Sequence, residues 1–269
     1  MVDIIKASGK IEPFNEQKLR ESIRRAGISK NIESLVAQHV KSKLYENIPT
    51  SEIYNHIIEF LGKSEIPHYK SKYSLKQAIM DLGPTGYPFE DFFAKIMETE
   101  AFKTETRKAL QGKAIAHEID ILSEKENLRI IVECKFHNNP GTKTDSQVAL
   151  FTKSRFDDVK ELNNLNQAWI VTNTKITKDA IDYALYYGLK AISWNFPEKE
   201  SLRDLIERTA SFPITILSAL SSGQKQRLLE KHIVLCRDLI SDQKNLIFLN
   251  LPEEKQRDVL EEAKFITGV

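Results

Sequence analysis

The sequence has few cysteines, no long apolar run and no excess of charge of either sign. Its 269 residues include two cysteines, Cys134 and Cys236, which lie far apart and do not form a disulfide framework, so we expect a reducing compartment. No stretch approaches the length of a membrane-spanning helix, and the N-terminal segment lacks the apolar core of a signal peptide. The formal net charge of +1 favours neither acidic nor basic partners. These absences predict a cytoplasmic protein that does not contact membranes.

The chain is long enough for more than one domain, and its Gly and Pro residues suggest where to divide it. We expect domains at residues 1–83, 84–197 and 198–269. The first boundary falls in GPTGYP, residues 83–88, which is dense in Gly and Pro and has no hydrophobic periodicity. We find no internal repeat and no low-complexity segment.

The first segment is expected to be a hairpin followed by helices. Two short extended pieces, DIIKA and KIEPF, are separated by Ser8-Gly9, a pattern typical of a tight turn between strands. Four helices are expected after the hairpin, because apolar residues recur at helical spacing behind capping residues; they begin near Asn15, Leu35, Thr50 and Pro67, and the fourth runs to Leu82.

The second segment predicts an α/β domain, within an α+β multidomain chain. Its order is expected to be helix, two strands, helix, strand, helix, strand, with the central strands at residues 112–122 and 129–136. Asp145 is a candidate cap for the second of these helices. Crossings of this kind imply a mixed sheet flanked by helices. The third segment is expected to be helical throughout.

The two central strands carry charge where apolar residues are expected. Side chains alternate across a strand, so Glu133 and Lys135 share one face, while Glu118 and Asp120 share a face of the neighbouring strand. If these strands pair, Asp120 and Glu133 converge, and two ionised carboxylates at close range are unfavourable without a cation. A hard ion such as Mg²⁺ prefers carboxylate oxygens, polarises a phosphoryl oxygen and lowers the pKa of a bound water, while Lys135 offsets charge on the phosphate.

The alternative is a structural ion pair between Lys135 and a carboxylate at a strand end. The pattern alone is short, but its surroundings favour the metal hypothesis. The apolar run IIV, residues 130–132, predicts a buried strand; a helix that carries Glu90 precedes the hairpin, and a helix capped by Asp145 follows it.

This segment resembles the PD-(D/E)xK nuclease superfamily, and most closely its Mrr-like restriction endonuclease branch, over residues 86–196. The resemblance is carried by YPFEDFF, HEIDIL, IIVECKF and AWIVTNTKITKDAIDYA. It implies a DNA-cleaving domain that uses Mg²⁺ or Mn²⁺, with the following residues in its site: Asp120, Glu133 and Glu90 as metal ligands, Lys135 as a catalytic residue, and Gln147 as a further catalytic candidate.

One part of the motif departs from the Mrr pattern. Relatives often read DxGxD up to the metal aspartate, whereas Ala116 and Glu118 occupy the first two of those places here. Glu118 is expected to face the site as a spare ligand. His117 is expected to point away from Asp120, as a packed or hydrogen-bonded side chain.

The hairpin and first helix resemble the ATP cone, the nucleotide-sensing domain of ribonucleotide reductases and of their transcriptional repressor, over about residues 2–82. The cone pattern V-x-K-R-x-G-x-x-E-x-F-x-x-x-K is matched by Ile4, Lys6, Gly9, Glu12, Phe14 and Lys18, and PTSEI matches the entry to the third helix. The resemblance implies an ATP or dATP site lined by Lys6, Glu12, Lys18 and Thr50. Ala7 replaces the usual arginine, and surface lysines without a ligand are the alternative.

The C-terminal helices give a weaker signal. PITILSALSSGQKQRLLEKHIVLCRDLI resembles helix-hairpin-helix modules, whose turn glycines approach DNA phosphates, but Gly223 is the single glycine of the turn. A helical cap or a dimerisation element is the alternative. The basic residues past the turn either contact DNA phosphates or lie on a solvated helix face; they are Lys225, Arg227 and Lys231.

Together these features predict a Mg²⁺-dependent DNA endonuclease that hydrolyses phosphodiester bonds and is regulated by ATP or dATP. A restriction or anti-phage role fits this combination, and we expect a homo-oligomer, because a cone can couple nucleotide binding to assembly. Two alternatives stay open. One is a nucleotide-responsive DNA-binding regulator with an inactive nuclease fold, and the other is a structure-specific DNA repair nuclease.

Overall fold

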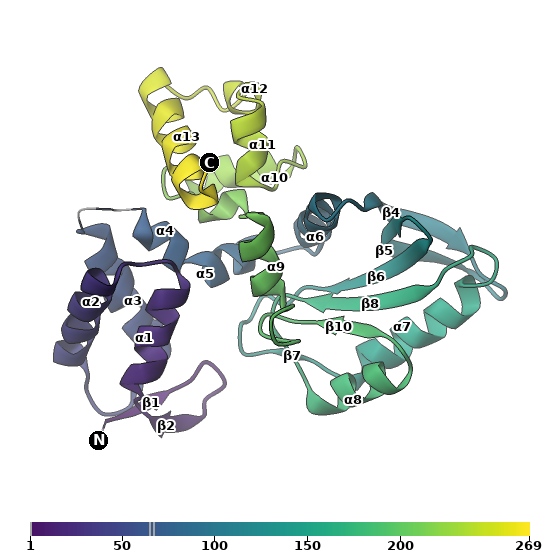
Figure 1. The fold of residues 1–269 in the computed structure, drawn as a ribbon, viewed down its shortest axis with the longest axis horizontal. Helices are drawn as coiled ribbons and strands as arrows, with labels where there is room; N and C mark the ends of the chain where they lie inside the picture. Colours follow the sequence, from purple (N-terminus) through teal and green to yellow (C-terminus); the bar gives the residue numbers. More distant parts are fainter. Residues whose placement is uncertain (1, 65, 67) are drawn as a thin grey trace.

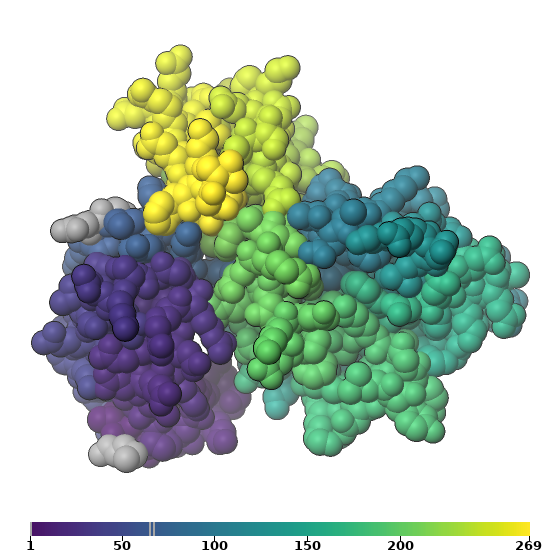
Figure 2. Space-filling model, in the orientation of Figure 1, coloured from purple at the N-terminus to yellow at the C-terminus, as the bar shows by residue number. Residues whose placement is uncertain are grey.

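The computed structural model describes residues 2–64, 66 and 68–269, which form three lobes (Figure 1). The N-terminal lobe, up to residue 82, lies beside a central lobe built on a five-stranded sheet, and the C-terminal lobe follows residue 197. The space-filling view shows the same three bodies in contact near the middle of the molecule (Figure 2). Within the described residues, no helix has both the length and the apolar character needed to cross a membrane.

The N-terminal lobe is the expected hairpin and helical cluster. Its strands are β1 (Asp3–Ile5), β2 (Ile11–Pro13) and β3 (Ile48–Pro49), with β2 antiparallel and β3 parallel to β1. Its helices are α1 (Glu16–Arg25), α2 (Lys30–Lys43), α3 (Thr50–Gly62), α4 (Tyr69–Tyr73) and α5 (Leu75–Met80). The Asn15 side chain accepts a hydrogen bond from the backbone N–H of Lys18 at 3.0 Å and so caps α1 as predicted.

The predicted fourth helix is wrong in one respect, because it is divided into α4 and α5 at Ser74. The Ser74 hydroxyl donates to the carbonyl of Lys70 at 2.8 Å and accepts from the Tyr54 hydroxyl at 3.0 Å. A serine bonded to its own preceding turn competes with helix continuation. The expected start at Pro67 lies outside the described residues. Strand β3 was not predicted, since two residues are too few for a periodic signal.

The central lobe is a mixed sheet, as predicted, in the order β10-β8-β6-β5-β4. Its strands are β4 (Lys103–Gln111), β5 (Ala116–Lys125), β6 (Leu128–Lys135), β8 (Gln167–Thr172) and β10 (Lys190–Ile192). Strands β4, β5 and β6 are antiparallel, whereas β6, β8 and β10 are parallel. A small ribbon of β7 (Lys143–Thr144) and β9 (Lys175–Ile176) lies beside it.

Helices cover both faces of this sheet. Helix α6 (Tyr87–Thr99) packs on the face that carries Ile121 and Val132, and α7 (Ser146–Val159) and α8 (Lys178–Tyr186) pack on the face that carries Leu122 and Ile131. Asp145 caps α7 by accepting from the N–H of Gln147 at 3.0 Å, as predicted. Because β6 is apolar on both faces, the charged residues at its end stand out as the exception.

Strand β4 was missed by the sequence analysis, which expected two strands rather than three after α6. Its sequence KTETRKALQ is polar and mostly exposed, because it is the edge of the sheet and pairs with β5 alone. An exposed edge strand does not need apolar alternation, so the usual signal is absent.

The C-terminal lobe is helical, as predicted. It contains α9 (Leu202–Thr209), a 3₁₀ turn (Ile214–Ile216), α10 (Ser222–Leu229), α11 (Cys236–Ser241), α12 (Lys244–Ile247) and α13 (Glu253–Thr267). Its apolar side chains form one continuous core with α5, α6 and one face of the sheet. Cys134 and Cys236 are both free and buried.

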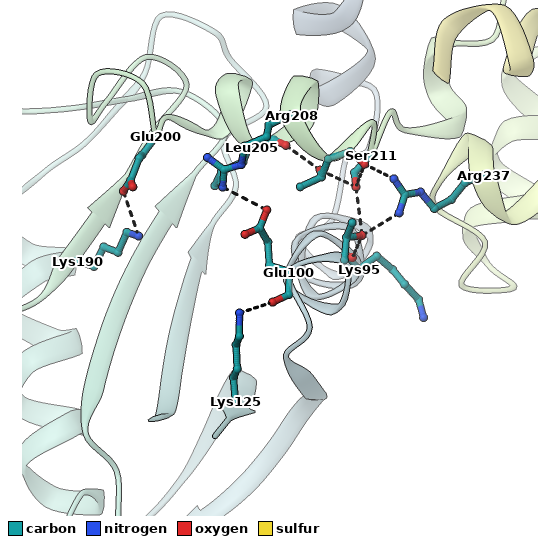
Figure 3. A network of polar contacts seen from close by, with 11 residues as sticks. Lys95, Glu100, Lys125, Lys190, Glu200, Leu205, Arg208, Ser211 and Arg237 are labelled. Carbon is teal, nitrogen blue, oxygen red and sulfur yellow. Dashed lines mark hydrogen bonds and ion pairs between the residues drawn. The ribbon is translucent and has the colours of Figure 1, made fainter. Parts of the chain in front are cut away.

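A polar network joins this lobe to the end of α6 (Figure 3). Arg208 of α9 bonds to the Glu100 carboxylate at 3.2 Å, Lys125 donates to the Glu100 carbonyl at 2.8 Å, and Arg237 donates to the Thr99 hydroxyl at 2.9 Å. The end of α6 is therefore attached to the sheet, to α9 and to α11, and α6 carries Glu90.

Two of the three basic residues that suggested DNA contact in this lobe are used internally. Lys225 donates to the carbonyl of Thr215 at 2.8 Å, and Arg227 donates to the carbonyl of Phe248. Lys231 is exposed. This arrangement favours the alternative in which α10 and its turn are a structural cap.

Candidate active site and N-terminal cavity

The predicted acidic residues meet where β5 and β6 stop pairing. The ladder between these strands ends at Ile121 and Val132. One residue further on, the Asp120 carboxylate accepts a hydrogen bond from the N–H of Cys134 at 2.7 Å, in place of a backbone acceptor. Asp120 thus lies against the peptide bond that joins Glu133 to Cys134, so its carboxylate is held next to Glu133.

This proximity is visible in the electrostatics of the pair. Burial raises the pKa of Asp120, against the opposing hydrogen bond from Cys134 and the charge of Arg155. Burial likewise raises the pKa of Glu133, and the negative charge of Asp120 raises it further, while Arg155 and Lys135 act in the opposite direction. Arg155, on α7, forms an ion pair with Glu133. Two carboxylates that disfavour joint ionisation are therefore accompanied by two cations.

A cavity of about 440 Å³ opens on the α7 side of these strands. Its lining combines charged and apolar groups: Ala114, Ile115, His117, Glu133, Lys135, Val148, Phe151, Ser154, Arg155 and Asp158. Glu133 and Lys135 share this cavity, as their spacing on one strand face predicts. Gln147 is exposed and is not among the lining residues, so its assignment to the site stays a prediction.

The expected direction of His117, away from Asp120, stays a prediction. His117 lines the cavity, and its Nε2 lies 2.9 Å from an Asp158 carboxylate oxygen. Side-chain alternation along β5 is interrupted at Asp120, because Ile119 packs on the α7 side of the sheet and Ile121 on the α6 side. The hydrogen-bonded part of the prediction for His117 is confirmed.

Glu90 reaches this region from the opposite side, on α6. Its side chain is buried and pairs with Arg107 at 3.1 Å, and Arg107 also pairs with Asp91 at 2.7 Å. Burial raises the pKa of Glu90 to about 7, and the charge of Asp120 adds to this shift while Arg107 opposes it. Glu90 is therefore close enough to Asp120 to respond to its charge, but its carboxylate is engaged by an arginine.

The donor set fits a divalent cation held by two carboxylates. Within the described residues, no three Asp, Glu, His or Cys side chains are arranged to hold one ion, so the structure does not assemble Glu90, Asp120 and Glu133 into a single set. Mg²⁺ is commonly held by one or two carboxylates, with water and substrate phosphate as its other ligands. Asp120 and Glu133 supply two carboxylates of this kind, and the roles of Asp120, Glu133 and Glu90 as metal ligands stay predictions.

Two arginines complete the site and were not assigned to it from the sequence. Arg155 of α7 is the ion-pair partner of Glu133. A sequence signal for Arg155 was available, because Val148, Phe151 and Arg155 are spaced three and four residues apart and so share one face of a helix. All three line the cavity. Arg107 has a backbone φ of 53° in an edge strand, which no sequence signal indicates.

The second predicted site is a cavity of about 240 Å³ in the N-terminal lobe. Its lining includes all four predicted residues, Lys6, Glu12, Lys18 and Thr50. Glu12 pairs with Lys6 at 3.0 Å and with Lys18 at 3.4 Å, and the hydrogen bond from Lys6 lowers the pKa of Glu12. The structure thus brings the predicted residues to one cavity.

Aromatic residues that the sequence analysis did not select form the inner wall of this cavity. Tyr54 and Tyr73 line it with their rings stacked at a centroid distance of 5.9 Å, and the Tyr73 hydroxyl lies 3.1 Å from the Ser22 hydroxyl. Tyr73 belongs to α4, so the cavity is closed by the helix that leads to the other lobes. Stacked rings beside two lysines suit a ligand with a planar base and a phosphate.

Replacing Glu90 with glutamine is expected to remove a pH-dependent loss of stability. Because the raised pKa means that folded Glu90 binds a proton more tightly than unfolded Glu90, its contribution is fully present below about pH 4.5 and is lost as pH rises through about 7. Without divalent metal, the free energy of unfolding of the wild type should therefore fall by up to about 3 kcal/mol relative to that of Glu90→Gln between pH 5 and pH 8. Urea unfolding in EDTA at both pH values measures this, and Glu98→Gln, an exposed position on the same helix, is the control. Parallel pH profiles of Glu90→Gln and wild type would contradict the prediction.

Comparison with known proteins gives matches along most of the chain. Family models match residues 2–79 as an ATP cone domain, residues 84–193 as a Mrr-type restriction endonuclease, and residues 212–267 as AF1548-like, C-terminal. The first two matches confirm the resemblances inferred from the sequence motifs.

Two relatives extend this result. An uncharacterized protein of Archaeoglobus fulgidus is 38% identical over 176 residues, which are 65% of this chain and 99% of that protein. The crystal structure of AF1548, a protein of unknown function, is similar with a TM-score of 0.59 and 36% identity, and the match covers 69% of this chain and 100% of that one.

Proposed function

We propose that this chain, which belongs to the AF1548-like family and carries an ATP cone ahead of a Mrr-type restriction endonuclease domain, is a metal-dependent endodeoxyribonuclease regulated by ATP or dATP. The observation that carries the proposal is the position of the Asp120 carboxylate on the peptide N–H that follows Glu133, at the end of the strand that presents Lys135 to a cavity. A structural ion pair does not need two adjacent carboxylates with raised pKa values.

The residues divide the work of phosphodiester hydrolysis. Asp120 and Glu133 would hold Mg²⁺ or Mn²⁺, which supplies positive charge to the scissile phosphate when bound. Lys135 lies in the same cavity as Glu133 and can donate a hydrogen bond to a phosphate oxygen, which offsets the charge that develops there. Arg155 holds the Glu133 carboxylate by an ion pair from α7 and so keeps its orientation.

The N-terminal cavity supports nucleotide regulation. Lys6 and Lys18 present their ammonium groups to Glu12, with side-chain exposures of 37% and 67%. A nucleotide phosphate can replace Glu12 as the partner of these two ammonium groups, because each lysine then exchanges one charge-assisted hydrogen bond for another. Restriction of foreign DNA under control of the ATP or dATP pool is the role that this combination favours.

The proposal is tested by incubating the full chain with supercoiled plasmid in Mg²⁺, in Mn²⁺ and in EDTA, with and without ATP or dATP. We expect nicked or linear product with either metal, none in EDTA, and a rate that changes with nucleotide. Methylated and unmodified plasmids separate a restriction role from general cleavage. Retardation of DNA without cleavage in either metal would overturn the proposal in favour of a regulator, and cleavage confined to junctions or flaps would assign a repair nuclease.

Replacing Lys6 with methionine is expected to weaken ATP binding by about 10- to 100-fold, because a charge-assisted hydrogen bond contributes about 1.5–3 kcal/mol. Lys10→Met is the matched control, since Lys10 is exposed on the same hairpin and does not line the cavity. Isothermal titration calorimetry of the full chain measures both affinities. An unchanged affinity in Lys6→Met would exclude this cavity as the phosphate site.

A further inference from the structure

A lysine of the connecting helix α5 reaches into the central lobe. Lys76 Nζ donates a hydrogen bond to the backbone carbonyl of Asn173 and lies 4.6 Å from the centroid of the Trp194 ring. Among the described residues Lys76 forms no ion pair, and burial lowers its pKa to about 8. The partners of this partly buried ammonium are therefore a carbonyl oxygen and an aromatic ring, not a carboxylate.

Asn173 connects Lys76 to the segment that follows β6, the proposed catalytic strand. Its side-chain oxygen accepts from the N–H of His137 at 2.9 Å, and its side-chain nitrogen donates to the carbonyl of His137 at 2.9 Å. Asn173 is fully buried and follows β8, in which Thr172 pairs with Lys135 of β6. The main chain two residues beyond Lys135 is therefore clamped by the residue that Lys76 holds.

A second contact joins the same segment to the nucleotide hairpin. Gly141 lies so close to Ala7 that a Cβ added at Gly141 would be 3.0 Å from the Ala7 carbonyl oxygen. Ala7 follows Lys6, which lines the N-terminal cavity. The N-terminal lobe thus contacts the loop that leaves β6, residues 136–142, directly at Gly141 and, through Asn173, also at His137.

Tyr73 is the residue at which this connection begins in the N-terminal cavity. It lines the N-terminal cavity and lies three residues before Lys76, on α4. The two short helices meet at Ser74, so a displacement of Tyr73 by a ligand is transmitted to α5 over a single residue. Each step from cavity to catalytic strand is a direct contact or a covalent link.

We infer that Lys76 and Asn173 are positioning residues, which connect occupancy of the nucleotide cavity to the loop after β6 and so to the placement of Lys135. This inference rests on the proposed function and specifies how its two sites communicate. It requires that the α4–α5 segment takes different positions in the empty and filled states.

Trp194 is a reporter of this contact that needs neither DNA nor metal. The chain has two tryptophans, so Trp169→Phe leaves Trp194 as the single tryptophan, with Lys76 against its ring, and excitation beyond the tyrosine absorption band selects its emission. In the full chain, ATP should change Trp194 emission, and Lys76→Met should abolish that change while equilibrium dialysis still shows ATP bound. Lys76→Arg should restore the response, and Gln77→Met, at the exposed neighbouring position, should retain it.

The second readout is cleavage. The ratio of kcat with and without nucleotide, expected to be about fivefold or more in the wild type, should approach one in Lys76→Met and in Asn173→Ala. Circular dichroism confirms that each variant is folded. A Trp194 signal that stays constant while ATP binds, or an unchanged kcat ratio in both variants, would overturn the inference and leave the nuclease proposal intact. A Trp194 response in a protein that cuts no DNA would refute the nuclease proposal and support the path through Lys76 and Asn173. A chain that binds no nucleotide would refute both nucleotide regulation and this path.

Discussion

Replacing Lys135 with methionine is expected to lower the cleavage rate by about 10²- to 10⁴-fold, the range that a positioned acid–base or charge-stabilising group contributes. Methionine keeps the length of the side chain but removes the ammonium group, which shares the cavity with Glu133 and Arg155. Because the Lys135 side chain is exposed, stability should hardly change. The measurement is single-turnover cleavage of plasmid with saturating metal.

The control for this experiment is Lys178→Met. Lys178 is an exposed lysine on α8 of the same lobe, paired with Asp182 at 2.5 Å, and it does not line the cavity. Lys178→Met should cleave at the wild-type rate. Asp120→Asn should lose activity together with Lys135→Met, since the amide keeps the shape of the carboxylate but not its charge. Equal cleavage by wild type, Lys135→Met and Asp120→Asn would exclude this site.

Replacing Glu262 with alanine is expected to destabilise the protein by about 4 kcal/mol, because four hydrogen bonds to a buried carboxylate would be lost, each contributing about 1 kcal/mol or more, and the buried Ser71 hydroxyl would lose its acceptor. Glu262, on α13, is 1% exposed, and its carboxylate accepts from the N–H and hydroxyl of Ser218, the N–H of Ala219 and the hydroxyl of Ser71. Ser71 belongs to α4, so the loss also loosens the N-terminal lobe from the C-terminal lobe. Urea unfolding measures the difference.

The adjacent residue provides the matched control. Glu261 is exposed on the same helix, so Glu261→Ala should change the free energy of unfolding by no more than about 0.5 kcal/mol. If Glu262→Ala were as stable as Glu261→Ala, the Glu262 carboxylate would not be what holds these three segments together. If Glu262→Ala destabilised the N-terminal lobe alone, that lobe would unfold in a separate transition at a lower urea concentration.

The pairing of β5 with β6 was predictable because its signal is local. Alternation with period two, a turn between residues 125 and 128 and an apolar run before Glu133 are all readable within twenty residues, and antiparallel pairing then brings Asp120 to Glu133. The cone residues were predictable for another reason, since Lys6, Glu12 and Lys18 belong to one continuous motif. The catalytic roles assigned to Asp120, Glu133, Lys135 and Gln147 stay predictions.

What the residues alone specified about this protein is most of the order of its elements, the mixed α/β sheet and the charged groups on its central strands, because periodicity and short-range pairing encode these. The folded structure decided four further features: the ion pair of Arg155 with Glu133, the position of His117 in the cavity lining, the edge strand β4, and the path from Tyr73 through Lys76 to Asn173. The contacts of Arg155, His117 and Lys76 join groups far apart in the chain, and the packing that brings them together leaves no periodic trace in the sequence. Strand β4 pairs with the next strand in the chain, but as a polar edge it lacks the apolar alternation that marks a strand.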